Sequence, residues 1–125
     1  MSTERKTPEY LTLEDLLDLT RDLGAGPVRD VGLLEAAVGR AQASAFGEDA
    51  YPTLSEKAAA LLHSVVCHHA LVDGNKRLGW LAAVVFLDLN GLTVAISNQE
   101  AFDLVMDVAR GVLDVPEIAA RLGAD

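Results

Sequence analysis

Two apolar segments, residues 58–67 and 78–89, are separated by ten residues that are mostly polar, HHALVDGNKR. Segments this apolar have to be buried, and each is long enough for about three turns of helix. Gly74, preceded by an aspartate, is a typical helix breaker, and Asn75 stands where the next helix would begin. The polar stretch therefore marks the junction between two buried helices, where charged and titratable side chains gather.

Helix signals continue through the first half of the chain, and no long stretch alternates as a strand would. Thr12 is predicted to cap a helix over residues 13–23, with an acid at its third position and a glycine after its end. Asp30 is predicted to start a second helix that runs to about residue 45. Residues 46–52 are predicted to form an exposed loop.

Four further helices are predicted after this loop, over residues 53 or 55 to the break at 73–74, residues 75–89, residues 97–110 and residues 114–123. The third helix carries His69 at helical spacing from its apolar face. The helix that begins near Asn75 is apolar nearly all round and is expected to be the buried central helix. The prediction is an all-α bundle of six helices in a single domain over residues 1–125, with residues 1–9 flexible.

Cysteine content and the amino terminus indicate the compartment. Cys67 is the single cysteine of the chain, so it has no internal disulfide partner, and a reducing environment suits it. Residues 1–9 lack the apolar core of a signal peptide. No apolar run reaches the roughly 20 residues that span a bilayer. These features predict a cytoplasmic protein without membrane association.

The charge balance argues against a nucleic-acid partner. The 125 residues include 19 acidic and 10 basic side chains, giving a net charge of −9. A surface this negative repels the phosphate backbone of DNA or RNA. The few positive charges are therefore informative, and Lys76 and Arg77 stand next to each other close to the only paired histidines.

The junction before the second apolar helix has the features of an anion site. The first N–H groups of a helix lack intrahelical partners and carry the positive end of the helix dipole. Gly74 permits close approach of a ligand to the backbone, and Asn75, Lys76 and Arg77 add donors and charge. Taken singly, these residues would be a turn and a solvated helix face; together they favour phosphate binding.

Two more side chains suit chemistry on a phosphate. Asp73 is a candidate ligand for magnesium (Mg2+), which takes one or two carboxylates together with phosphate oxygens. His69 is a candidate general base for an attacking hydroxyl, whereas His63 and His68 are expected to be structural. A base, a metal ligand and a phosphate cradle are the parts required for phosphoryl or nucleotidyl transfer.

Residues 69–77, HALVDGNKR, resemble the signature H-x-F-x-(D/E)-G-N-(G/K)-R of the Fic/Doc superfamily. Lys76 stands where AMP-transferring Fic enzymes usually carry glycine, and Trp80 stands where many of them carry a second arginine. Both features resemble the Doc branch, the death-on-curing toxins of toxin–antitoxin systems. The stretches VGRAQ at 38–42 and VFLDLNGLTV at 85–94 resemble the same family at matching separations.

The resemblance implies a specific activity. Doc toxins use ATP and magnesium to phosphorylate a threonine of elongation factor Tu, which arrests translation. Their partner is a Phd-type antitoxin, whose C-terminal segment folds as a helix across a groove of the toxin. By position, the resemblance implies His69 as general base, Asp73 as magnesium ligand, Gly74 and Asn75 as part of the anion cradle, and Lys76 and Arg77 as ligands of the ATP phosphates.

Three alternatives remain open at this point. The chain could transfer AMP rather than phosphate, or it could be a degenerate fold that only binds its antitoxin. A third possibility is a transition-metal site for phosphoester hydrolysis built from His63, His69 and Asp73. Leu71 replaces the usual phenylalanine, which is a buried anchor in the family, and we expect the leucine to be tolerated.

Overall fold

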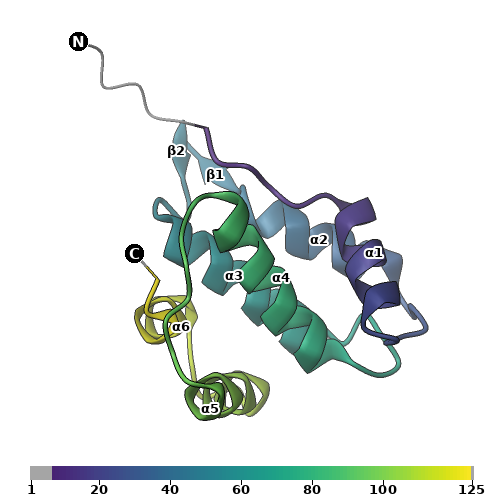
Figure 1. Cartoon of the computed structure of the whole chain (residues 1–125). Coiled ribbons are helices and arrows are strands. Elements are labelled where there is room, and N and C mark those ends of the chain that lie inside the picture. Colours follow the sequence, from purple (N-terminus) through teal and green to yellow (C-terminus); the bar gives the residue numbers. More distant parts are fainter. Residues whose placement is uncertain (1–6, 125) are drawn as a thin grey trace.

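The computed structural model describes residues 7–124 as six helices and one short β-hairpin (Figure 1). The helices are α1 (Leu13–Asp22), α2 (Val31–Ala41), α3 (Leu54–His68), α4 (Asn75–Leu89), α5 (Asn98–Ala109) and α6 (Val115–Leu122), and the hairpin pairs β1 (Ser44–Ala45) with β2 (Glu48–Asp49). The predicted all-α bundle is confirmed. Most of the segment predicted to be flexible, residues 1–6, lies outside the described residues.

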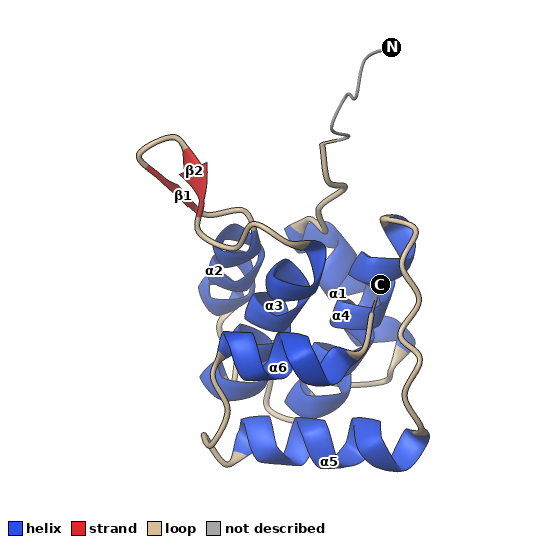
Figure 2. Ribbon diagram, turned by 90° about the vertical axis from the view of Figure 1, so that its left-hand side faces the viewer, coloured by secondary structure: helices blue, strands red, loops and turns tan. Residues whose placement is uncertain are grey.

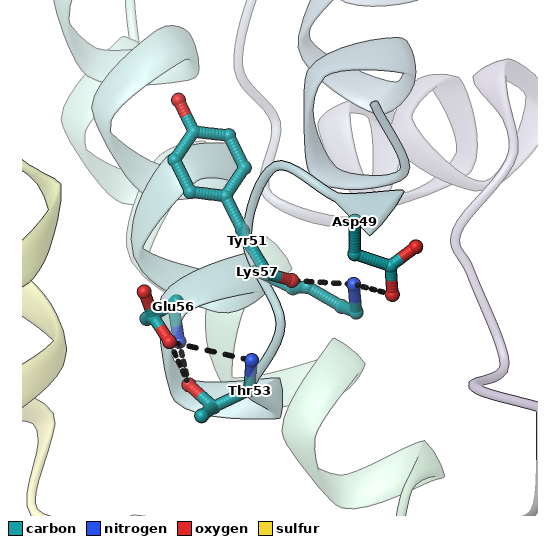
Figure 3. A network of polar contacts seen from close by, with 5 residues as sticks. All are labelled: Asp49, Tyr51, Thr53, Glu56 and Lys57. Atoms are coloured by element: carbon teal, nitrogen blue, oxygen red, sulfur yellow. Dashed lines mark hydrogen bonds and ion pairs between the residues drawn. The ribbon is translucent and has the colours of Figure 1, made fainter. Parts of the chain in front are cut away.

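The helices begin where the sequence places their caps. Thr12 and Ser97 start α1 and α5, and Thr53, rather than Ser55, starts α3. Thr53 Oγ1 accepts a hydrogen bond from the N–H of Glu56 at 3.1 Å, and the Glu56 carboxylate accepts the N–H of Thr53 in return (Figure 3). Each such pair satisfies two N–H groups that the first helical turn leaves without partners.

Two helices end earlier than predicted. Helix α2 stops at Ala41, because residues 44–49 turn back on themselves as the hairpin, with Phe46 and Gly47 both at positive φ. Helix α3 stops at His68, because His69 adopts a left-handed backbone at φ 53° and ψ 50°. Local periodicity is compatible with helix in both places, so tertiary contacts decide the ends.

The hairpin is held by a lysine that the bundle encloses. Lys57 of α3 is only 1% exposed, and its ammonium donates hydrogen bonds to the Asp49 carboxylate at 2.9 Å and to the Tyr51 carbonyl (Figure 3). It also lies 5.9 Å from the centroid of the Tyr10 ring. A buried amine without partners is costly, so these contacts fix β2 to the start of α3.

Helices α3 and α4 form the middle layer of the molecule. Helices α1 and α2 pack on one side of this pair, and α5 and α6 pack on the other (Figures 1 and 2). Leu78, Ala82 and Phe86 of α4 are buried in the core, whereas its Val84 and Val85 are only partly covered. Helix α3, which contacts α2, α4, α5 and α6, is therefore more enclosed than α4. None of the helices within residues 7–124 combines the length and the apolar character that a membrane span requires.

The close crossing of α3 and α4 leads to a prediction about stability. A Cβ added to Gly79 would lie 2.6 Å from Val66 Cγ2, whereas one added to Gly39 in α2 would meet no neighbour within 4 Å. Gly79→Ala should therefore lower the free energy of unfolding by about 1–3 kcal/mol through overpacking. Gly39→Ala should raise it by about 0.5–1 kcal/mol, because alanine loses less backbone freedom on folding. Urea unfolding measures the free energy of unfolding of both variants, which should change in opposite directions. Equal changes would contradict the close packing of α3 against α4 at Gly79.

Candidate active site

The polar junction lies at the end of α3 away from the hairpin, where the chain turns into α4 (Figure 1). Its side chains line a cavity of about 290 Å³. The chain enters the junction from α3, passes through residues 69–74 and leaves as α4. The structure brings the six predicted site residues together in the wall of the cavity: His69, Asp73, Gly74, Asn75, Lys76 and Arg77. Val66, Val72 and Ala109 supply its apolar lining.

Asn75 holds the junction loop through its side chain. Its Oδ1 accepts a hydrogen bond from the N–H of Leu71 at 2.9 Å, and its Nδ2 donates to the Leu71 carbonyl at 3.0 Å. The side chain thus pairs with Leu71 as a neighbouring strand would. Leu71 itself is fully buried, so leucine fills the anchor position. The Asn75 side chain is thus used in part to hold the loop, and its backbone N–H at the start of α4 is a further donor for an anion.

Gly74 is required by the packing of the protein itself. Its φ is +96°, and a Cβ there would lie 2.5 Å from the Cβ of Ala25. The conformation suits glycine, and the linker between α1 and α2 leaves no room for a side chain. Gly74 also precedes α4 without any side-chain cap. The first N–H groups of α4 therefore remain as donors for an anion.

The charged side chains of the site are accessible to solvent. Arg77 Nη2 lies 3.9 Å from the Asp73 carboxylate, and its Nη1 donates to the Leu23 carbonyl at 3.2 Å. The Asp73 side chain is 85% exposed, and an ion pair this exposed contributes little to stability. Asp73 can thus exchange this contact for a cation, and Lys76, which is also exposed, can reach a phosphate group.

The linker between α1 and α2 forms the outer support of the loop. Gly26 N–H donates to the Asp73 carbonyl at 2.8 Å, and Val72 N–H donates to the Pro27 carbonyl at 2.9 Å. Val28 forms an isolated antiparallel bridge with Leu71, next to the bond between Val72 and Pro27. The junction loop is therefore paired on one side like a strand, through contacts with a segment more than 40 residues earlier in the chain.

The residues present fit magnesium and a phosphate chain. Magnesium takes one or two carboxylates and completes its shell with water and phosphate oxygens, so a single exposed Asp73 is a suitable donor. Within residues 7–124, no three His, Cys, Asp or Glu side chains come close enough to hold a metal by themselves. The alternative of a transition-metal site at His63, His69 and Asp73 is therefore wrong.

His63 belongs to a separate polar cluster between α2 and α3. Arg40 Nη1 lies 2.9 Å from His63 Nδ1 and 3.1 Å from Ser64 Oγ, and Arg40 Nε donates to the Tyr51 hydroxyl at 3.0 Å. Burial, followed by the positive charge of Arg40, lowers the pKa of His63 below its ordinary value. His63 thus accepts a hydrogen bond as a neutral ring, which agrees with a structural role.

Cys67 shows no sign of a nucleophile. Burial raises the pKa of the Cys67 thiol, and its Sγ lies 3.5 Å from the Val108 carbonyl as a hydrogen-bond donor. A raised pKa keeps the thiol protonated, and the thiolate is the reactive form.

An apolar groove lies beside the site, between α4 and α5. Its volume is about 330 Å³, and its lining includes Trp80, Ala101, Phe102, Val105 and Met106. Phe102 is 61% exposed although it is a large apolar side chain. Lys76 and Arg77 line both the groove and the cavity at the polar junction. An occupant of the groove would therefore lie against the two basic side chains.

Comparison with known proteins adds three findings. A model of the Fic/DOC family matches residues 10–87, which include the junction loop. The chain is 50% identical over 118 residues to a protein named Toxin Doc of Mycolicibacterium smegmatis, covering 91% of each chain. It is 32% identical over 116 residues to the Protein kinase doc of Escherichia phage P1, covering 93% of this chain and 90% of the phage protein.

Proposed function

The chain belongs to the Fic/DOC family, as residues 69–77 predict, and on this premise we propose that it transfers the γ-phosphate of ATP to a protein hydroxyl. The proposed acceptor is a threonine of elongation factor Tu. One observation carries the proposal: His69, Asp73, Lys76 and Arg77 line one cavity at the uncapped start of α4. The name of the phage relative, a protein kinase, supports the same activity.

The reaction divides among these side chains. His69 takes the proton of the target hydroxyl as its oxygen attacks the γ-phosphorus, and the bond to the bridging oxygen of ADP breaks. Lys76 and Arg77 neutralise the charge that builds on the phosphate oxygens, together with the first N–H groups of α4. Asp73 would hold magnesium, which when bound offsets further phosphate charge.

Lys76 favours transfer of phosphate over transfer of AMP. An ammonium group is a compact point charge that suits a terminal phosphate, and the side chain occupies space beside the loop that a glycine would leave open. The γ-phosphate of ATP would then lie next to His69. This orientation is the reverse of the one that would present the α-phosphate to the base.

The partner we propose is a Phd-type antitoxin that lays a helix into the groove between α4 and α5. An amphipathic helix suits an apolar groove of this kind, and Phe102 and Trp80 offer it aromatic contacts. Since Lys76 and Arg77 border the groove, a bound helix would also restrict access to the phosphate site. The pair would act in the cytoplasm, where ATP and the translation factor meet.

Expression of this chain alone is expected to halt growth of a bacterial host, because modified elongation factor Tu stops translation. Co-expression of its antitoxin should relieve the arrest, and His69→Ala expressed alone should be harmless. Growth curves and the soluble amount of each protein check this outcome. Harmless expression of soluble wild-type protein would contradict the proposal and favour a fold that only binds antitoxin.

A further inference from the structure

We propose that Arg29 is a positioning residue for His69. Arg29 lies in the linker between α1 and α2, outside residues 69–77, and its Nη2 donates a hydrogen bond to the His69 carbonyl at 2.7 Å. The bond joins two residues that are 40 positions apart in the chain. This inference rests on the proposed function, since it assigns Arg29 a role through the proposed base.

His69 needs outside support because of its backbone. Its φ of 53° and ψ of 50° lie in the left-handed region. A residue with a Cβ adopts this backbone conformation only at a cost in free energy. Such a residue keeps this conformation only where its surroundings impose it. This conformation ends α3 and also sets the direction in which the imidazole leaves the backbone. A contact that stabilises the conformation therefore also orients the proposed base.

The linker supplies this support at two successive carbonyls. The His69 carbonyl accepts a hydrogen bond from the guanidinium of Arg29. The Ala70 carbonyl accepts hydrogen bonds from the backbone N–H groups of Arg29 and Asp30, at 2.7 and 3.0 Å. Both carbonyls follow the end of α3, where the helix dipole is negative and a positive side chain is favoured. Arg29 thus uses its backbone and its side chain on neighbouring peptides of the loop.

The position of Arg29 separates this role from nucleotide binding. Among the described residues, Arg29 does not line the cavity that holds His69, Lys76 and Arg77, and it forms no ion pair with an acid. Within residues 7–124, its side chain makes one hydrogen bond, to the backbone carbonyl of the base itself. Its effect on the reaction should therefore pass through the orientation of His69 rather than through contact with ATP.

The test compares Arg29→Ala and Arg29→Lys with a control, Arg121→Ala. Arg121 on α6 also makes a short side-chain hydrogen bond, 2.8 Å to Asp107, but away from the loop. The kcat and the KM for ATP of phosphate transfer are measured for each protein, and amide hydrogen exchange of residues 69–75 is measured without ATP. Thermal unfolding shows that each variant is folded.

Arg29→Ala should lower kcat about tenfold, the effect of losing one charged hydrogen bond, and should speed exchange in the loop. Its KM for ATP should stay within about twofold of the wild-type value, since no ground-state contact with ATP is removed. Arg29→Lys should recover part of kcat because an ammonium can still donate to the His69 carbonyl. Arg121→Ala should leave kcat and exchange unchanged.

Two results would overturn the inference. A raised KM with unchanged kcat would make Arg29 a nucleotide contact, and unchanged kcat with unchanged exchange would make it an ordinary surface residue. If the wild-type protein transfers no phosphate at all, the proposed function fails separately. In that case the exchange measurement alone decides: faster exchange only in Arg29→Ala supports the positioning of His69, and equal exchange overturns it.

Discussion

His69→Ala is expected to reduce phosphate transfer by about 10²–10⁴-fold, the usual contribution of a positioned general base. The imidazole lines the cavity and is exposed, so its removal takes away the proton acceptor without opening a hole in the core. The His69 bond to Arg29 uses the backbone carbonyl, which alanine retains. The fold should therefore survive, and the rate of transfer to elongation factor Tu at saturating ATP checks the loss.

His68→Ala is the matched control for this substitution. His68 is the last residue of α3, is also exposed, and does not line the cavity. We expect it to keep most of the wild-type rate. Equal losses in the two variants would show that the register of the motif is wrong.

Asn75→Ala is expected to lower the free energy of unfolding by about 2–4 kcal/mol, because two hydrogen bonds are lost and a buried backbone pair is left without partners. Both bonds reach Leu71, whose side chain anchors the loop in the core. The loop should also become less ordered, and the rate of phosphate transfer should therefore fall to a small fraction of the wild-type rate. Urea unfolding and the transfer assay on the same samples check the two effects.

Asn75→Asp separates the bracing role from a direct anion contact. The carboxylate can still accept the Leu71 N–H, but it cannot donate to the Leu71 carbonyl. We expect an intermediate loss of stability and a severe loss of transfer, because a negative charge now lies at the phosphate site. Gln99→Ala, which removes an exposed amide from α5, should change neither property. An unchanged free energy of unfolding in Asn75→Ala would contradict the role of the Asn75 side chain in holding the loop.

Local sequence signals predict the helices of this fold well. Thr12, Thr53 and Ser97 each cap a helix with an acid three residues later, and Gly123 ends α6 in a left-handed conformation. These devices act within one turn of helix, so the residues involved are neighbours in the sequence. The limits of α4 are also those expected from the asparagine at its start and the Asn-Gly pair after its end.

Contacts between distant segments account for what the sequence does not predict. Lys57 looks like a solvated helix residue until the hairpin places Asp49 beside it. The early end of α2 has a related origin, since residues 44–49 pair as the hairpin and Lys57 of the distant helix α3 binds its second strand. Likewise, Gly74 lies in the expected loop, but its close packing against Ala25 requires the linker between α1 and α2 to be in place. The sequence predicts which residues form the loop, but it does not predict the contacts with the linker that hold the loop in place.

The most direct test of the proposed activity uses ATP labelled separately at its α and γ phosphorus, with elongation factor Tu as the acceptor and His69→Ala as the inactive control. Lys76 beside His69 in one cavity favours the terminal phosphate as the group transferred. We predict that the acceptor gains label only from the γ position, with the mass of one phosphate. Label from the α position, with the mass of one AMP, would contradict the proposed transfer of the γ-phosphate.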